Sequence, residues 1–538
     1  MSGTGLTWLA LLALTALYAA TSTWNEAFWW SDAPQHALNG ALIHDWILSG
    51  RWGHPVSFAD SYFLHYPAIN IALYPPLFPV VEAAAYGLAG VSDATAQALE
   101  TCFTLLAVVS AYRIARLALP AGASLGAAAL VLALPVVALW SRQVMLEMPA
   151  LSLLLAGSVP LLRYAREPRA AWLYQGAALL VLAINMKQTA AFAAAAWAVL
   201  LLWQHGWGWL RRRHVWVAAA IAGLALLPLA VFTLTVARYN LQSVGGTVSD
   251  KPLAQSLTFY AAALPDTAGW LMTGAALAYL ALLAWRGAAS AGEKLLARWA
   301  GVWFGVTYVL STAVGHKESR YAFFMVAPLG IVAALLLHRV LRGRSWAVCA
   351  TGFAVLAVTL VAWPVRQVDG YQQAASYILA HASPGSVVLF HGLRSPNFVY
   401  SMRSRGATPS LYILRAEKFL VHYTIHRDNG VVDLGLTPPQ VQGLIDRYGI
   451  EYVVMQPDFW TDQPSVAAFQ ALIRGGGFER AVVIPVHANF PGAETRVEIW
   501  RNLHPVPRTG TTISFDLPVL GRALNESLGA APAAGAAH

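Results

Sequence analysis

The chain has 538 residues, of which 57% are hydrophobic and only 11% are charged, and its formal net charge is +9. Soluble domains carry about 25% charged residues, so this composition excludes an ordinary soluble protein. The positive charge does not indicate nucleic-acid binding, because the arginines are spread over short loops between apolar runs. The two cysteines, Cys102 and Cys349, each lie inside an apolar run and exclude a disulfide framework.

Eleven apolar segments, recurring from Leu6 to Pro364, are predicted as membrane spans. They cover about residues 5–24, 95–115, 122–140, 149–163, 171–185, 189–205, 215–236, 268–285, 298–314, 322–338 and 346–364. Every second connecting loop is rich in arginine, and the positive-inside rule assigns these loops to the cytoplasm. The other loops, and everything after Pro364, are therefore expected on the outer side.

The first outer loop, residues 25–94, is the largest and is rich in tryptophan, a residue suited to the water–lipid interface. Its run from Tyr74 to Gly90 is apolar and carries Glu82, but it is shorter than the roughly 20 residues that a crossing needs. We predict a helix that lies in the interface. Counting this run as a span would also reverse the predicted membrane side of every later loop. The arginine-rich loops would then no longer all lie on the cytoplasmic side.

After Pro364 the pattern changes to short β-strands, predicted at 386–392, 410–415, 450–456, 481–487 and 495–500. A helix is predicted between Thr437, as its N-cap, and Gly449. Strands that alternate with helices indicate a small α/β domain. The expected organisation is a transmembrane domain at 1–365, a periplasmic α/β domain at 366–505 and a disordered tail at 506–538.

Asp32 follows the first span in the segment WSDAPQH. A carboxylate at a membrane boundary, in a loop with tryptophans, can have a raised pKa and act as a general base. His36 lies one helical turn further on and could orient Asp32 or the acceptor. The structural alternative is a solvated aspartate that caps a helix before Pro34.

Two further outer segments carry charge. Arg142 and Glu147 lie between the third and fourth predicted spans, and Lys187 lies in the short turn after the fifth. Glu147 precedes Pro149 at the positive end of the next helix, which by itself would explain it structurally. Lys187 is a candidate phosphate ligand, although a lysine there can also extend harmlessly to the interface.

The fourth segment, HKESRY, contains His316, Lys317, Glu318, Arg320 and Tyr321 between two long apolar runs. Charges beside a bilayer are costly and usually functional. Arginine offers a planar fork to phosphate oxygens and lysine adds a point charge, so this segment suits a lipid phosphate. The alternative is an interfacial ion-pair cluster in which Glu318 neutralises both cations.

Weaker candidates lie in the first outer loop. Tyr66 and Tyr74 flank the segment before the Pro75-Pro76 pair and are candidate substrate contacts. Asp45, Asp60 and Glu82 are reserve candidates for the role of base.

Taken together, these segments resemble the GT-C superfamily of membrane glycosyltransferases, in the bacterial branch similar to protein O-mannosyltransferases and the lipid A aminoarabinose transferase. The likeness covers about residues 1–365. Asp32 matches the acidic motif of the family's first outer loop, although Ala33 replaces a second acid. The remaining matches are YPPLFPVVEAAAYGLAG for the interfacial helix, Arg142, Glu147 and Pro149 after the third helix, Lys187 after the fifth, and HKESRY for the His-Lys-Glu-x-Arg-aromatic motif.

The resemblance implies an α-helical polytopic fold of about eleven transmembrane helices, with the active site on the periplasmic face of the bacterial cytoplasmic membrane. It implies an inverting transfer of a sugar from a polyprenyl-phosphate donor to an acceptor hydroxyl of a glycolipid, polysaccharide or protein. Asp32 would be the base, and Glu147 would position the acceptor or assist. The implied donor-phosphate ligands are Lys187, His316, Lys317, Arg320 and Tyr321, and the implied substrate contacts are His36, Tyr66, Tyr74, Arg142 and Glu318. The mechanism requires Asp32 and HKESRY to meet in one pocket.

The sequence has no nucleotide-binding loop, nucleophile elbow or distinct metal-ligand motif. The sequence therefore does not predict a definite cofactor. A divalent metal near Asp32 and Glu147 is left open. The main alternative function is a transporter or flippase of lipid-linked sugars. Such proteins place charged residues within their spans or show paired halves, whereas the mid-span positions here are almost free of charge. A non-catalytic envelope scaffold would leave HKESRY unexplained.

Overall fold

The computed structural model describes residues 3–25, 27–238, 251–406, 410–423, 430–508, 511–517, 520 and 522–529. It consists of two compact units. The first unit comprises Met1–Ser22, Leu73–Phe78 and Gln97–Val365, and the second comprises Thr23–Ala72, Pro79–Ala96 and Arg366–His538. Most of the first outer loop is thus grouped with the C-terminal region, whereas the sequence analysis assigned residues 1–365 to one domain.

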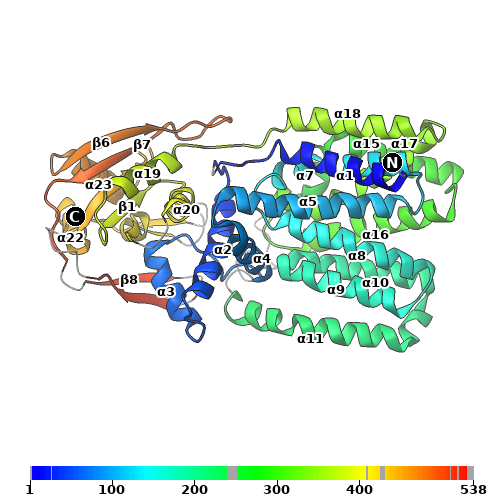
Figure 1. Ribbon diagram of the computed structural model, residues 1–538, viewed down its shortest axis with the longest axis horizontal. Coiled ribbons are helices and arrows are strands. Elements are labelled where there is room, and N and C mark those ends of the chain that lie inside the picture. The colour runs from blue at the N-terminus through cyan, green and yellow to red at the C-terminus, as the bar shows by residue number, and fades with distance from the viewer. Residues whose placement is uncertain are drawn as a thin grey trace. The chain divides into compact units, whose positions relative to one another are not determined.

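Long helices build the first unit (Figure 1). They are α1 (Gly3–Ala19), α5 (Asp93–Ala115), α6 (Ala121–Leu132), α7 (Pro135–Trp140), α8 (Glu147–Arg166), α9 (Ala170–Met186), α10 (Phe192–His205), α11 (Arg213–Thr235), α13 (Leu253–Ala262), α14 (Leu264–Thr267), α15 (Gly269–Arg286), α16 (Ala291–Ala313), α17 (Phe323–Val340) and α18 (Ser345–Ala362), with the 3-10 helices η1 (Gln188–Ala191), η2 (Trp207–Arg211) and η3 (Ser319–Ala322). Every predicted span coincides with one or more of these helices. The third predicted span is divided between α6 and α7 at Pro135, because a proline disfavours helical backbone in the residue before it.

Five helices in the described part of the chain are long and apolar enough to cross a membrane: α5, α8, α11, the continuous Ser319–Val340 segment, and α18. The pair Leu253–Thr267 and Gly269–Arg286, bent by 114°, adds a sixth if it is one broken span. The chain is therefore a multi-pass membrane protein. The count of eleven crossings stays a prediction.

Glycines allow the helices of the first unit to approach closely. A Cβ at Gly126 of α6 would lie 2.5 Å from the carbonyl oxygen of Val348, and a Cβ at Gly352 of α18 would lie 2.5 Å from the carbonyl oxygen of Gly126. Helices in lipid gain little from burying apolar surface, so close backbone packing at small residues is a main source of their association. Gly126 and Gly352 therefore fix how α6 packs on α18.

A five-stranded mixed sheet forms the centre of the C-terminal part of the second unit (Figure 1). Its strands are β1 (Val387–His391), β2 (Tyr412–Arg415), β5 (Ile450–Met455), β6 (Phe478–Pro485) and β7 (Arg496–Asn502), in the order β2-β1-β5-β7-β6. β1 is parallel to β2 and β5, and β7 is antiparallel to β5 and β6. All five predicted strands are present.

Helices pack in pairs beside this sheet: α19 (Tyr371–His381) with α20 (Ser395–Arg405), and α22 (Pro438–Tyr448) with α23 (Pro464–Arg474). Val453, Ile445 and Phe469 belong to one buried apolar cluster that joins the sheet to α22 and α23. As predicted, Thr437 caps α22, and a capping box with Gln440 closes its first turn. Gly449 ends the helix in the left-handed conformation with a φ of 56°.

Smaller elements complete the second unit: α21 (Glu417–Leu420), the β3 (Val421–Tyr423)–β4 (Val431–Asp433) pair, and the β8 (Thr512–Leu517)–β9 (Arg522–Ser527) hairpin. The hairpin lies inside residues 506–538, where the sequence analysis expected a disordered tail. Residues 530–538 of the predicted tail lie outside the described part of the chain.

The first outer loop contributes α2 (Asp32–Leu48), α3 (Pro55–His65) and α4 (Leu77–Ala89). α4 is the helix predicted for the interface. α2 and α3 contact the C-terminal part of the second unit: the ring of His65 stacks on Tyr412 with centroids 4.7 Å apart, and its Nδ1 lies 2.7 Å from the carbonyl oxygen of Leu411. The guanidinium of Arg522 pairs with Asp60 on α3. These contacts explain why the loop and the C-terminal region form one unit.

Candidate active site

The first unit contains a cavity of about 100 Å³. Its walls come from α8, η1, the start of α10, α13, α16, η3 and α17, together with Tyr74. Most of the lining is apolar or aromatic, including Phe192, Trp303 and Phe324. Two cations, Lys187 and Arg320, also line the cavity. An apolar cavity with two cations suits an amphipathic anion.

Glu147 joins the two cations. Its Oε1 accepts a hydrogen bond from Lys187 Nζ at 2.5 Å and lies 3.6 Å from Arg320 Nε. Local structure places the three groups: Glu147 is the first residue of α8, Lys187 is the residue that ends α9, and Arg320 lies in η3. The side chains are 1%, 11% and 9% exposed, respectively. The structure therefore brings together one predicted carboxylate and two predicted phosphate ligands.

Arg320 is held from several sides. A guanidinium nitrogen lies 3.1 Å from Oε2 of Glu318, and the guanidinium carbon lies 5.1 Å from the ring centroid of Trp140 in α7. A cation over an indole face is stabilised by the ring quadrupole. Tyr321, the next residue, also lines the cavity. The fork of Arg320 is thus fixed at the cavity wall.

The other cationic members of HKESRY have different partners. Lys317 Nζ donates to the carbonyl oxygens of Thr312, at 2.7 Å, and Val314. These carbonyls belong to the end of α16, where lysine commonly satisfies unpaired carbonyl groups. His316 Nε2 lies 3.2 Å from Oε1 of Glu318. Neither Lys317 nor His316 is among the described residues that line the cavity.

Arg142 is almost fully buried and does not line the cavity. Its guanidinium donates to the carbonyl oxygens of Ala138, at 2.6 Å, and Trp363, and to the hydroxyl of Thr21 at 3.0 Å. Three chain segments that follow or end helices therefore meet at one cation. This arrangement gives Arg142 a structural role. Tyr74, which was also predicted as a substrate contact, does line the cavity.

Sequence reasoning missed several cavity residues, among them Tyr260, Thr307 and Ser311. Trp303, Thr307 and Ser311 follow one another at intervals of four in α16 and so share one helix face. This repeat of polar groups inside an apolar span was the available signal. Tyr260 had no comparable signal, because it lies in the separate short helix α13.

Asp32, His36 and Tyr66 belong to the second unit. Asp32 opens α2, is partly exposed, and accepts a hydrogen bond from Trp30 Nε1 at 3.2 Å. His36 is buried one turn further on. Tyr66 is buried at the end of α3 with its ring 4.8 Å from that of Tyr62, and burial raises its pKa to about 12.

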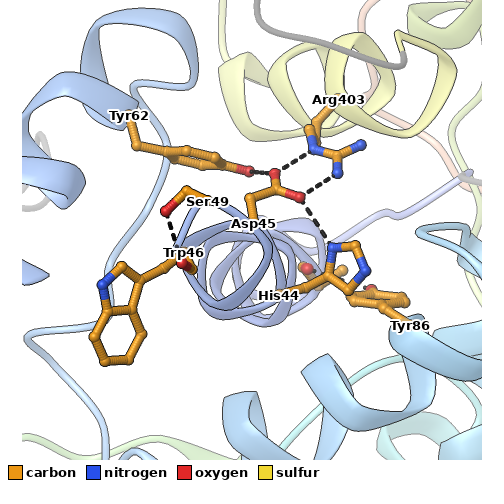
Figure 2. Close-up of polar contacts among 8 residues, drawn as sticks. His44, Asp45, Trp46, Ser49, Tyr62, Tyr86 and Arg403 are labelled. Carbon is orange, nitrogen blue, oxygen red and sulfur yellow. Dashed lines mark hydrogen bonds and ion pairs between the residues drawn. The ribbon is translucent and has the colours of Figure 1, made fainter. Parts of the chain in front are cut away.

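Figure 2 shows a polar cluster around Asp45 near the other end of α2. Arg403 of α20 donates to Asp45 through Nε at 2.6 Å and Nη2 at 2.5 Å. Tyr62 donates at 3.0 Å, and His44 Nδ1 lies 3.0 Å away. Burial alone would raise the pKa of Asp45, but the hydrogen bonds and charge of Arg403 outweigh burial and hold the pKa below 3.8. Asp45 is therefore a charged structural anchor.

The other reserve carboxylates are also engaged. Asp60 pairs with Arg522. Glu82 is fully buried against α2, where a Cβ at Gly40 would lie 2.3 Å from its Oε2. Tyr86 donates to Oε1 of Glu82 at 3.3 Å. Within the described part of the chain, no group of three or more His, Cys, Asp or Glu side chains is arranged to hold a metal ion.

Comparisons with known proteins bear on the whole chain. A family model described as dolichyl-phosphate-mannose-protein mannosyltransferase matches residues 74–232. The fold is similar to the crystal structure of ArnT from Cupriavidus metallidurans bound to undecaprenyl phosphate, with a TM-score of 0.62 and 14% identity over 93% of this chain and 99% of that chain. The apo state of the same protein matches with a TM-score of 0.61 and 14% identity over 94% of this chain and 99% of that chain.

A weaker match is the oligosaccharyltransferase of Archaeoglobus fulgidus in complex with Zn and sulfate, with a TM-score of 0.47 and 12% identity over 83% of this chain and 67% of that chain. That similarity is too low to carry an argument. Among curated proteins, none matches this chain in sequence. At 14% identity, the likeness to ArnT establishes the fold.

Proposed function

We propose that this chain is a membrane glycosyltransferase of the GT-C superfamily and that it transfers a sugar from a polyprenyl-phosphate donor to an acceptor hydroxyl. The similarity of its fold to ArnT and the family-model match at residues 74–232 support this proposal. The cavity with Lys187 and Arg320 in its wall is the observation that carries this proposal. Its apolar lining suits prenyl carbons, and its two cations suit a phosphate. The comparison structure of ArnT contains undecaprenyl phosphate, a ligand of this class.

In the proposed reaction, the acceptor oxygen attacks the anomeric carbon from the face opposite the phosphate, so the configuration inverts. A new carbon–oxygen bond forms as the bond between the anomeric carbon and the phosphate oxygen breaks. The acceptor proton passes to a carboxylate base, and polyprenyl phosphate leaves. The acceptor is a hydroxyl of a glycolipid, polysaccharide or protein on the outer face of the bacterial cytoplasmic membrane.

We assign the base to Asp32. Two other carboxylates of the first outer loop, Asp45 and Asp60, are paired with arginines. A carboxylate in a strong ion pair has a lowered pKa and is a poor base, because its proton affinity is reduced. Asp32 lies in the first turn of α2, directly after the first predicted span, and accepts a hydrogen bond from the indole of Trp30.

Lys187 and Arg320 stabilise the negative charge that develops on the leaving phosphate. Fixed cations in a site of low polarity act strongly on developing charge. Tyr321, also at the cavity wall, can donate a hydrogen bond to a phosphate oxygen. Lys317 and His316, predicted for the same role, are assigned instead to holding HKESRY against the end of α16 and against Glu318.

Two measurements test this function on the full-length protein in detergent. Binding of undecaprenyl phosphate should weaken about 10- to 100-fold in Lys187→Ala and Arg320→Ala, since one charge-assisted hydrogen bond contributes about 1.5–3 kcal/mol. Lys294→Ala, which removes an exposed lysine of α16, should leave binding unchanged. Equal binding by all three variants would contradict the assignment of the cavity as the phosphate-binding site.

The second measurement follows transfer of a radiolabelled sugar from a prenyl-phosphate donor. Asp32→Asn should abolish transfer and retain donor binding, because an amide cannot accept the acceptor proton. Full transfer by this variant would reassign the base, first to Glu147.

A further inference from the structure

Glu147 already holds the two cations that the proposed phosphate would use. Its Oε1 lies 2.5 Å from Lys187 Nζ and 3.6 Å from Arg320 Nε. Lys187 and Arg320 face the cavity, whereas Glu147 is not among its lining residues. The carboxylate therefore approaches both cations from behind the cavity wall.

A buried cation without a counter-charge is strongly destabilising. Glu147 supplies this counter-charge in the structure, because its side chain is only 1% exposed and meets both Lys187 and Arg320. The same geometry creates a conflict when an anion enters. A phosphate that contacts Lys187 and Arg320 lies close to Glu147, and two anions at short range in a poorly solvated site repel each other.

We propose that Glu147 is an internal competitor for the lipid phosphate, holding Lys187 and Arg320 while the cavity is empty and lowering the affinity for polyprenyl phosphate. This inference rests on the proposed function and adds a means of regulating the same site. Entry of the phosphate releases Lys187 from Glu147. The repulsion is stronger toward the product, because a phosphate monoester carries about −1.5 to −2 charges at neutral pH whereas the diester donor carries one. Glu147 thus favours departure of the product.

The fold provides a place for the released carboxylate. Glu147 is the first residue of α8, a helix of 20 residues. The N-terminus of a helix carries a partial positive charge that stabilises a nearby carboxylate. Glu147 can therefore separate from Lys187 without becoming an uncompensated buried charge.

The first test compares dissociation constants for undecaprenyl phosphate, measured by native mass spectrometry on the full-length protein in detergent. Glu147→Gln keeps the size of the side chain and removes its charge, and we expect it to bind at least about tenfold more tightly, a change of about 1.4 kcal/mol. Glu293→Gln is the matched control, because Glu293 also forms a buried ion pair in the first unit, but with Arg339, which does not line the cavity. It should change the constant less than about threefold, because the charges at the cavity wall stay the same. Neutral undecaprenol should bind equally to wild type and Glu147→Gln.

The second test is a double-mutant cycle that does not depend on a buried lysine lacking its partner. Lys187→Met alone should bind undecaprenyl phosphate more weakly than wild type, because Glu147 then opposes the phosphate without a neutralising lysine. Adding Glu147→Gln to Lys187→Met removes both charges, a replacement that buried ion pairs tolerate. The double variant should regain at least about tenfold in affinity over Lys187→Met.

The outcomes separate the two proposals. If neither wild type nor any variant binds undecaprenyl phosphate, the proposed function fails and this inference fails with it. If wild type binds but Glu147→Gln binds equally or more weakly, or the double variant regains nothing, Glu147 merely positions Lys187 and the inference alone is overturned. An equal gain in Glu293→Gln, or for undecaprenol, would also overturn it, because the effect would then not be specific to Glu147 and phosphate.

Discussion

The pair between Asp45 and Arg403 should be a main contributor to the stability of the second unit. Arg403→Ala removes two short hydrogen bonds and leaves the carboxylate, only 18% exposed, with Tyr62 and His44. Breaking a buried ion pair on one side costs about 3–5 kcal/mol, and we expect about 3 kcal/mol because Asp45 keeps two partners. The second unit has roughly 240 residues, so this loss corresponds to a decrease in Tm of about 6–12 °C.

The assay is thermal unfolding of the full-length protein in detergent, together with hydrogen exchange of α2 and α20. Protection should decrease in both helices, because the pair joins them. Arg405→Ala is the matched control on the same helix: Arg405 is exposed and its Nη1 lies 3.4 Å from the hydroxyl of Ser376. It should change stability by less than about 0.5 kcal/mol.

The pH dependence of the destabilisation gives a second test with the same variant. In wild type, the pKa of Asp45 is depressed, so its stabilisation is complete above 3.8 and is lost only as the pH falls through the lower folded-state value. In Arg403→Ala, burial remains without the arginine and the pKa should rise above 3.8. The destabilisation should therefore shrink as the pH is lowered from 7 toward 4. A destabilisation equal to that of Arg405→Ala, or one that grows on acidification, would refute this reasoning.

Two further predictions concern the second unit. Burial lowers the pKa of His391 from 6.5 to about 4, although Glu417 opposes this, so the unfolded chain takes up the proton first and stability falls by about 3 kcal/mol between pH 6.5 and 4. His391→Leu should flatten this part of the Tm-against-pH curve, and an unchanged slope would contradict the assignment. Gly40→Ala should destabilise by about 1–3 kcal/mol, because its Cβ would clash with Glu82. Gly87→Ala, in α4 with open space around it, should be neutral or stabilising by up to about 1 kcal/mol. Equal Tm shifts in the two alanine variants would contradict the close contact.

Local patterns predicted the elements well. Each apolar segment predicted as a span coincides with one or more helices of the first unit. Each of the five predicted strands is present in the sheet. The hairpin of β8 and β9 was missed although Ile513, Phe515 and Leu517 alternate in the manner of a strand. The disordered tail was predicted from the alanine-rich segment that ends the chain, APAAGAAH.

Contacts between residues that lie far apart in the chain could not be predicted from a single sequence. Nothing in the local pattern around Asp45 indicates that its partner is Arg403, which lies 358 residues away. The same limit applies to the cavity: Glu147, Lys187 and Arg320 were each predicted, but their meeting depends on how α8, α9 and η3 pack. Lys317 carried the same motif signal as Arg320, yet the carbonyls that end α16 are its partners.

The interleaved division of the chain has a consequence for biogenesis. α2 and α3 leave the ribosome early, but Arg403 follows Asp45 by 358 residues. At about 5–20 residues per second, the anchoring arginine is synthesised about 20–70 s later. During that interval the early segment lacks its partner, so the second unit cannot be completed until Arg403 has been synthesised. A nascent chain stalled just after Pro364 should accordingly leave α2 more accessible to proteases than in the complete protein.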